Sequence, residues 1–445
     1  MNRRRSFLLS LVGTVALAAC QSDTETASSS TGVAPGNADA PLDQIAADYV
    51  HLVLAMGVHD ENHVDSYFGP EEWIDEGVAR FPTLDSIRSA ADGLLQRLGA
   101  LQTPQDDLVR RRAEGLEKRL IALDARIDIV SGVPLSFDEE ARLVFDAVAP
   151  DYDAAHFEGV LEQLDALLPG EGSLNERARA FWDQFVIPPE RLEAVFEAAI
   201  NECRRRTLER IALPPGEDFT LEYVTDRPWS GYNWFQGNAF SLIQINTDLP
   251  RHIDRAVDLG CHEGYPGHHA YGTLVERELY DGRGWVEFSV YALFGPQSLL
   301  SEGSANYGID LAFPGRERLE FERSTLFPLA GLDVGQADTY HIYLDLQKQL
   351  SYARNEAARD YLDGRMSRGE AVSWMQRYQL NSAEEAEQAL DFIETYRAYV
   401  INYNLGRDLV RSYIEREAGA DQERRWALFE RLLSEPVSVA DISGR

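Results

Sequence analysis

Residues 261–269 read Cys-His-Glu-Gly-Tyr-Pro-Gly-His-His, and the interpretation of the whole chain starts from this stretch. It holds three of the nine histidines, His262, His268 and His269, together with the acid Glu263. A neutral imidazole is the commonest metal ligand in proteins, and a carboxylate beside a metal-bound water can accept a proton from that water. This stretch therefore predicts a metal centre that carries its own general base.

A straight α-helix does not make such a centre at this spacing. The zinc-peptidase signature has its second His four residues after the first, but here that position holds Pro266. On a regular helix, His268 lies about 9 Å along the axis from His262, and His269 about 10 Å. Two nitrogens bound to one zinc ion lie only about 3–3.5 Å apart. Because Pro266 removes a backbone donor and Gly267 permits unusual torsions, we expect the helix to bulge or break there.

A third ligand is expected from a later helix. The stretch 301–307 reads Ser-Glu-Gly-Ser-Ala-Asn-Tyr and places an acid directly after the apolar pair Leu299-Leu300. Three protein ligands leave the fourth position of a tetrahedral zinc ion open for water, as a catalytic site requires. The predicted ligands of a single Zn²⁺ are His262, His268 and Glu302, with His269 as the alternative to His268.

These stretches resemble a bacterial lipoprotein family that is catalogued as domain of unknown function 885. The resemblance rests on the motifs His262-Glu263-x-x-Pro266-Gly267-His268-His269, Glu302-Gly303-x-Ala305-x-Tyr307 and Tyr403-x-x-Gly406. Ser304 stands where the family has Trp, and the Pro-Gly-Gln run expected before Tyr403 does not occur. The family is similar to the mainly helical zinc carboxypeptidases (gluzincin-like), in which two His and a downstream Glu hold the metal.

The motifs suggest a role for each candidate residue. Glu263 is the predicted general base, and the resemblance nominates Tyr403 as the donor to an oxyanion. Arg397 is a candidate for binding a substrate carboxylate in bidentate fashion, although a structural ion pair is the alternative. His341 is a further candidate donor to the substrate, with a place in the core as its alternative.

The expected activity is zinc-dependent hydrolysis of a peptide or small amide, as in a carboxypeptidase. Zinc chemistry does not name the acyl group, so a metal hydrolase for a non-peptide ester or amide stays open. A non-catalytic envelope lipoprotein with a degenerate peptidase fold also stays open. Ser304 and the missing Pro-Gly-Gln run favour the latter, whereas the intact Glu263 favours an enzyme.

The N-terminus is typical of a bacterial lipoprotein signal. Three arginines precede the apolar run Phe7–Ala19, which is too short to span a bilayer as a helix. The run ends in Leu-Ala-Ala followed by Cys20, which resembles a lipoprotein cleavage box with Cys20 as the lipidated residue. We therefore expect a signal peptide at 1–19 and a flexible tether at 20–41.

These signals predict an envelope protein that a lipid on Cys20 anchors to the outer membrane, facing the periplasm. Arg4-Arg5 and the residues after them also resemble a twin-arginine signal, so that route and general secretion both stay open. The formal charge of −32 argues against binding nucleic acid and against electrostatic attraction to anionic lipid. The lipid itself is therefore the expected membrane contact.

Residues 42–445 are predicted to form a single mainly helical domain. Hydrophobic residues make up 44% of the chain, which suffices for a large core, and they recur at helical spacing in many segments. Two alternating stretches, 219–224 and 239–246, predict short strands before the histidines, and 285–311 is expected to return to helix. The predicted fold class is a large helical metallopeptidase-like domain with a small β-sheet beside the cleft.

Cys203 and Cys261 remain once Cys20 is assigned to the lipid. They could form a disulfide in an oxidising compartment, or Cys261 could be a small buried side chain beside the first histidine. We favour the buried thiol. No Cys-x-x-Cys spacing occurs in the sequence, so iron–sulfur and c-type haem sites have no support.

Overall fold

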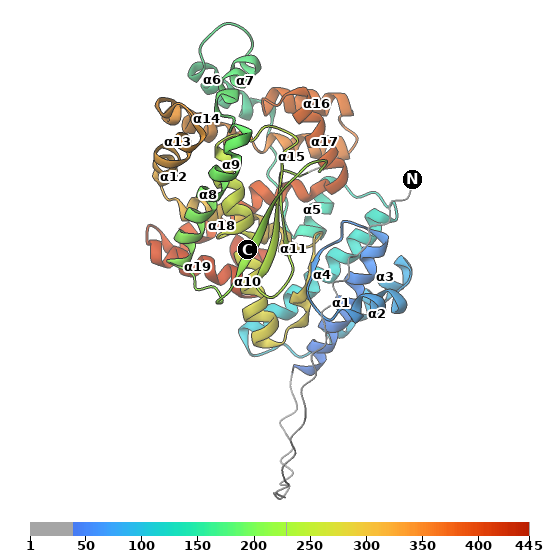
Figure 1. The fold of residues 1–445 in the computed structure, drawn as a ribbon. Coiled ribbons are helices and arrows are strands. Elements are labelled where there is room, and N and C mark those ends of the chain that lie inside the picture. The colour runs from blue at the N-terminus through green and yellow to red at the C-terminus, as the bar shows by residue number, and fades with distance from the viewer. Residues whose placement is uncertain (1–38, 228, 445) are drawn as a thin grey trace, which may run out of the picture. The chain divides into compact units, whose positions relative to one another are not determined.

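The computed structural model describes residues 39–227 and 229–444 (Figure 1). Pro41–Arg445 forms one unit. The predicted signal peptide at 1–19 and the lipidated Cys20 lie outside the described residues, as does most of the tether. No helix in the described part of the chain is both long and apolar enough to cross a membrane.

Helices form most of the structure, which confirms the mainly helical fold class. Several begin at a Ser whose side chain accepts a hydrogen bond from the first turn, as at Ser136, Ser173 and Ser367. The α-helices are α1 (Ala40–His59), α2 (Glu72–Arg80), α3 (Leu84–Gly99), α4 (Asp107–Val130), α5 (Phe137–Phe145), α6 (Ala154–Leu167), α7 (Leu174–Trp182), α8 (Leu192–Leu208), α9 (Asp254–Leu259), α10 (His268–Val275), α11 (Pro296–Ala312), α12 (Glu317–Phe321), α13 (Phe327–Ala330), α14 (Ala337–Gln349), α15 (Ala353–Leu362), α16 (Arg368–Tyr378), α17 (Ala383–Tyr396), α18 (Ile401–Ala418), α19 (Gln422–Ser434) and α20 (Val439–Ser443).

The strands form two small sheets. The strands are β1 (Val64–Tyr67), β2 (Asp218–Val224), β3 (Gly231–Phe235), β4 (Phe240–Asn246) and β5 (Val290–Ala292). β2 runs parallel to β4, and β3 pairs antiparallel with β4, so the larger sheet has the order β2-β4-β3. β1 and β5 make an antiparallel pair. The strands predicted at 219–224 and 239–246 are confirmed as β2 and β4.

The helix expected over 285–311 is wrong in its first part. Val290–Ala292 is strand β5, and α11 begins only at Pro296, in the first helical position that proline favours. The partner of β5 is β1, where Tyr67 lies opposite Val290. Pairing with a strand so distant in the sequence overrides a local helical pattern, which no short window of sequence could reveal.

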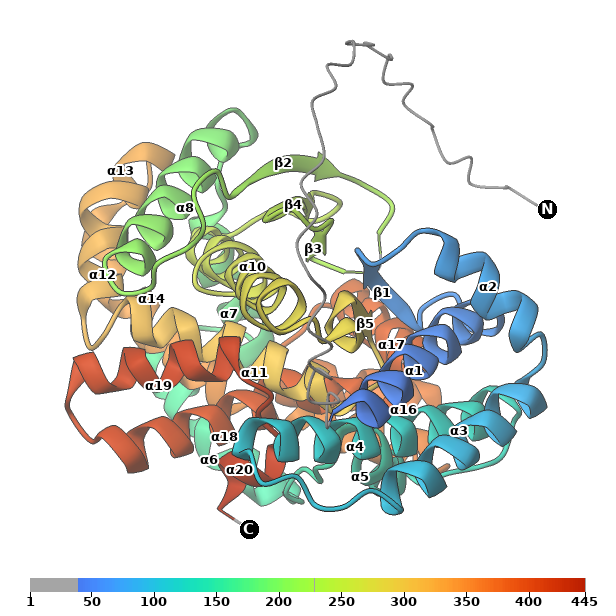
Figure 2. The same ribbon diagram turned by 90° about the horizontal axis from the view of Figure 1, so that it is seen from below.

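The centre of the fold is the pair α11 and α18, whose backbones touch. A Cβ atom added to Gly303 would lie 2.4 Å from the carbonyl carbon of Gly406, so both helices need glycine at this crossing. Figure 2 shows α10 between the larger sheet and α11, and α10 contacts both. The histidine motif therefore lies where α10 begins, between the sheet and the central helix pair.

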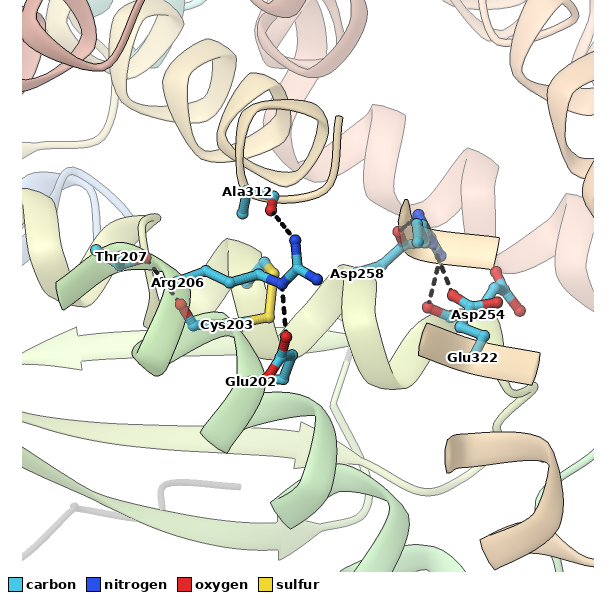
Figure 3. The surroundings of a disulfide bond; sticks show 10 residues. Glu202, Cys203, Arg206, Thr207, Asp254, Asp258, Ala312 and Glu322 are labelled. Atoms are coloured by element: carbon cyan, nitrogen blue, oxygen red, sulfur yellow. Dashed lines mark hydrogen bonds and ion pairs between the residues drawn. A yellow bond between two sulfur atoms is a disulfide. The ribbon is translucent and has the colours of Figure 1, made fainter. Parts of the chain in front are cut away.

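A disulfide joins Cys203 of α8 to Cys261, with the Cα atoms 5.5 Å apart (Figure 3). The expectation of a buried thiol at Cys261 is therefore wrong, because α8 packs against the histidine segment and presents Cys203 to it. On the same helix, Arg206 donates to the carbonyl of Ala312 across 2.8 Å. The residue before His262 is thus covalently tied to α8, which itself contacts the end of α11.

Candidate metal centre

The helix through the histidine motif widens and then breaks, as the sequence predicts. α9 continues into a π-helical turn at Gly260–Gly264, and α10 starts at His268. The N–H of Gly267 donates to the carbonyl of Cys261 across 3.0 Å. A Cβ atom on Gly267 would lie 1.8 Å from the carbonyl oxygen of His262, so the turn back towards that residue requires glycine.

This turn brings His262 and His268 together, and α11 adds Glu302. The two Nε2 atoms lie 3.1 Å apart. Oε2 of Glu302 lies 3.1 Å from Nε2 of His262 and 3.6 Å from Nε2 of His268. Donor atoms around a tetrahedral zinc ion are separated by about 3–3.5 Å, so these three atoms fit that geometry.

The charges around these atoms favour a cation. Oε2 of Glu302 is buried and makes no hydrogen bond with good geometry, so it lacks a partner that a metal ion would supply. Burial alone would raise the pKa of this carboxyl, but His268 and His262 hold it well below its ordinary value. Burial likewise opposes a charge on His268, yet Glu302, Glu263 and Asp65 raise its pKa to about 9. The field that would protonate the imidazole would equally stabilise a divalent ion.

Two residues that the sequence reasoning missed orient these ligand atoms. The hydroxyl of Tyr399 donates to Oε1 of Glu302 across 2.7 Å and leaves Oε2 for the histidines. Oγ of Ser301 lies 3.1 Å from Nδ1 of His268, which directs Nε2 of that ring to the centre. Outer hydrogen bonds of this kind fix the orientation of metal ligands. Ser301 adjoins Glu302 in the sequence, whereas no motif marks Tyr399.

Glu263 lies beside the pair of histidines and is buried. Its carboxylate and the ring nitrogens of His262 and His268 all lie within 4.8 Å of one another. β3 packs closely on this residue: Nδ2 of Asn233 donates to the Glu263 carbonyl across 2.7 Å, and a Cβ on Gly231 would lie 2.7 Å from Oε1. Burial raises the pKa of the Glu263 carboxyl, which suits a group that must accept a proton and release it again.

Tyr403 lies in α18, which packs against α11. Its ring stacks with that of His262, with the centroids 6.5 Å apart and the planes 30° apart. Burial and the charges of Glu302 and Glu263 raise the pKa of its hydroxyl, and no side-chain hydrogen bond to that hydroxyl occurs among the described residues. The phenol is thus near the ligand atoms and free to donate to a bound molecule. Its position follows from the helix crossing, because Gly406 lies one turn further along α18.

His269 points away from this centre. Its Nε2 lies 3.0 Å from the carboxylate of Glu217, and its Nδ1 lies 2.8 Å from Oγ of Ser241 in β4. Tyr265 also donates to Glu217, and Arg204 pairs with it across 2.6 Å. The structure therefore brings His268 to Glu302, and it places the alternative ligand His269 in a separate buried network.

The two residues proposed for substrate binding have partners elsewhere. Nε of Arg397 lies 2.6 Å from the buried carboxylate of Glu140. Nε2 of His341 lies 2.8 Å from the buried Glu322, which also pairs with Arg318. These contacts match the structural alternatives weighed for both residues, and neither side chain is among the groups that meet at Glu302.

Asp65 in β1 is a further charged group beside the centre, and no sequence motif marks it. It lies close enough to His268, Glu302 and Glu263 for their charges to act on it. Burial, with the two glutamates, raises the pKa of its carboxyl to about 7. The hydroxyl of Tyr232 donates to its backbone carbonyl across 3.2 Å. This wall of the site is therefore acidic and aromatic.

Comparison with known proteins identifies a solved structure with a similar fold, but it indicates no activity for this chain. No family model matches the chain, and no curated protein matches it. Among solved structures, a presumed lipoprotein from Colwellia psychrerythraea matches with a TM-score of 0.52 and 15% identity, over 82% of this chain and 69% of that chain. A presumed lipoprotein of unknown function from Shewanella oneidensis matches with a TM-score of 0.40 and 13% identity, over 85% of this chain and 79% of that one.

A protein called BsuCP matches with a TM-score of 0.47 and 12% identity, over 91% of this chain and 94% of that chain. At such low identity the Colwellia protein shows a shared fold alone. The resemblance to family 885 thus rests only on the motif residues themselves.

Proposed function

We propose that this protein is a zinc-dependent hydrolase of the bacterial cell envelope that cleaves peptide bonds. One observation carries the proposal: Nε2 of His262, Nε2 of His268 and Oε2 of Glu302 converge within 3.1–3.6 Å, with Glu263 beside them. The side chains of His262 and His268 are 12% and 18% exposed, so the centre is reachable from solvent. Two histidines, a glutamate and an open fourth position are the donor set of a catalytic zinc.

Bound zinc would acidify a water molecule and polarise the carbonyl under attack. Glu263 accepts a proton from the attacking water as the new carbon–oxygen bond forms. It then delivers this proton to the leaving nitrogen as the carbon–nitrogen bond breaks. The Tyr403 hydroxyl, to which no described side chain is hydrogen-bonded, donates to the oxygen that gains negative charge.

The envelope location is part of the proposal. Its support is the lipoprotein-type leader ending at Cys20, together with the fold shared with a presumed lipoprotein from Colwellia psychrerythraea. Anchoring through Cys20 would hold the enzyme at a membrane without a spanning helix. Radiolabelled palmitate incorporated by the full chain but not by a Cys20→Ser variant would test this anchor.

The proposed activity can be tested on the protein without its leader. Elemental analysis measures the zinc content, and an assay of peptide hydrolysis measures turnover. We expect about one zinc ion per chain in the wild type and in Glu263→Gln, and loss of zinc in His262→Ala. Turnover should be lost in His262→Ala with the zinc. It should also be lost in Glu263→Gln, because that change removes the base and keeps the ligands. His269→Ala is the matched control for His268→Ala, and only the latter should lose zinc.

Two results would overturn the proposal. The first is a wild-type protein that binds no zinc tightly, since the three converging atoms would then have another purpose. The second is full peptide hydrolysis by Glu263→Gln, because the carboxylate within 4.8 Å of both histidines would then not be the general base.

A further inference from the structure

Arg354 in α15 is a half-buried cation beside the candidate site that lacks a carboxylate partner. Within the described part of the chain it makes no ion pair and no side-chain hydrogen bond, and its Nε is buried without a partner. Its guanidinium carbon lies 5.8 Å from the ring of Phe392. That ring is 6.2 Å from the ring of Tyr403, which in turn stacks on His262. Aromatic side chains therefore connect this cation to the metal centre.

An unpaired arginine at this depth needs an explanation, because the chain holds 74 acidic residues against 42 basic ones. Several other buried arginines have acids at close range, such as Arg359 with Glu356 at 2.5 Å, whereas Arg251 resembles Arg354 in having a buried Nε without a partner. The Nε of Arg354 is removed from water without a partner, and burying a polar group in this way costs free energy. Burial lowers the pKa of Arg354, and only Tyr403 opposes the effect, which agrees with the missing carboxylate.

The helix that carries Arg354 is held against α18. The neighbouring residues, Asn355 and Asn404, exchange two amide hydrogen bonds of 3.0 and 3.1 Å between α15 and α18. Nε1 of Trp374 donates to the carbonyl of Ala353 across 2.9 Å and holds the start of α15. The cation is thus presented by a rigid helix pair and not by a loop, as a binding group should be.

We propose that Arg354 binds a carboxylate of the substrate on the side of the site formed by Tyr403 and Phe392. This inference rests on the proposed function and adds a specificity-determining residue to it. A guanidinium can hold a carboxylate through two parallel hydrogen bonds, and the partner that the protein fails to provide is such an anion. The role replaces the one first considered for Arg397, which already pairs with Glu140. The carboxylate belongs to the C-terminus of a peptide or to an acidic side chain near it.

The test compares three peptides of one sequence: a free acid, its C-terminal amide, and an amide with glutamate as the last residue. Charge-assisted bidentate bonds predict a kcat/KM for the free acid about 10- to 100-fold above that for the simple amide. In Arg354→Gln this ratio should fall to about 1, mainly through KM, while Arg354→Lys keeps part of it. Preference for the glutamate amide over the free acid would assign the contact to a side chain.

A matched control is Arg283→Gln. Arg283 is exposed and also contacts an aromatic ring, Trp285, at 5.0 Å, so its loss should leave the ratio of acid to amide unchanged. Thermal unfolding and zinc content of Arg354→Gln show whether the variant is intact. Because each variant is compared with itself on two peptides, a partial loss of active protein does not alter the ratio.

Binding to the inactive Glu263→Gln protein separates this inference from the proposed activity. Calorimetry should show the free acid binding about 10- to 100-fold more tightly than the amide, and equal binding once Arg354→Gln is added. Hydrolysis without any difference between acid and amide would overturn the role of Arg354 and leave the peptidase intact. Binding that depends on Arg354, in a protein that hydrolyses nothing, would overturn the peptidase and leave this contact intact.

Discussion

The hydroxyl of Tyr399 donates to one carboxylate oxygen of Glu302 across 2.7 Å, and the second oxygen faces His262 at 3.1 Å. The two carboxylate oxygens of the buried Glu302 side chain thus have different partners. The first is held by α18 with its preceding turn, and the second is left for the candidate metal. Because Tyr399 itself is buried, its hydroxyl is restricted to this contact.

Tyr399→Phe should weaken zinc binding by about 10- to 100-fold while the fold is retained, because loss of an outer hydrogen bond frees the ligand to rotate. Competition with a chelator measures the affinity. Tyr396→Phe is the matched control, since that ring lies 6.1 Å from the ring of Tyr399 and has no hydrogen bond to Glu302 among the described contacts. Equal zinc affinity in both variants would show that the hydroxyl does not orient the ligand.

Gly303→Ala should destabilise the protein by about 1–3 kcal/mol, because the added methyl group meets the backbone of Gly406 at 2.4–2.5 Å and must push α11 and α18 apart. Urea denaturation measures the loss in free energy of unfolding. The neighbouring Glu302 should shift with its helix, so zinc affinity falls as well.

Gly115→Ala is the control for this helix glycine. It lies within α4, and nothing would lie within 4 Å of its new Cβ atom, so the higher helix propensity of Ala should stabilise the protein by about 0.5–1 kcal/mol. If both variants lose the same stability, close contact between the two central helices is not what glycine provides at Gly303.

Replacing Cys203 and Cys261 together by Ala should lower the free energy of unfolding by about 4 kcal/mol, since the disulfide closes a loop with a sequence separation of 58. Denaturation with and without a thiol reductant measures this. Wild type in reductant should approach the double variant, whereas the double variant itself should not respond. A wild type that is insensitive to reductant under denaturing conditions would contradict the crosslink.

The sequence predicted the break in the histidine helix, and the structure supplies the physical reason for it in Gly267. It named His268 as the ligand with His269 as the alternative, and the difference between them in the structure depends on Glu217 and Ser241, which lie on other elements. The spacing of a motif depends only on residues within one segment. It therefore cannot indicate which residues of other elements will contact those side chains in the folded protein. The same limit explains why a buried thiol at Cys261 was favoured over the disulfide with Cys203 that the structure contains.

Residues that support the site were harder to predict than those that form it. Tyr399 and Arg354 lie in helices whose local patterns are typical of ordinary core packing, and only the crossing of α11, α15 and α18 gives them a role. Arg397 was a candidate for binding a substrate carboxylate, with a structural ion pair as its alternative, and it pairs with Glu140. Glu140 lies in α5, and nothing in the sequence around Arg397 indicates this partner.

His63 makes the stability of the fold depend on pH. The side chain is buried, and neither ring nitrogen has a hydrogen-bond partner in the described structure. Burial lowers its pKa to about 4; the Asp60 carboxylate opposes the shift and Arg126 adds to it. Phe294 covers one face of the ring, with centroids 6.4 Å apart. Folded His63 therefore stays neutral at a pH where an unfolded histidine, with a pKa of about 6.5, already binds a proton.

Between about pH 6.5 and pH 4 the unfolded chain binds more protons at this position than the folded chain, so stability falls as the pH decreases through that window. At the acidic end of this window, the difference between the two pKa values lowers the free energy of unfolding by about 3 kcal/mol. His63→Phe should remove this part of the acid sensitivity. Urea denaturation at about pH 7 and about pH 4.5 measures it, with His59→Gln at the end of α1 as the control. If His63→Phe loses as much stability on acidification as the wild type does, then the buried imidazole is not a source of the pH dependence.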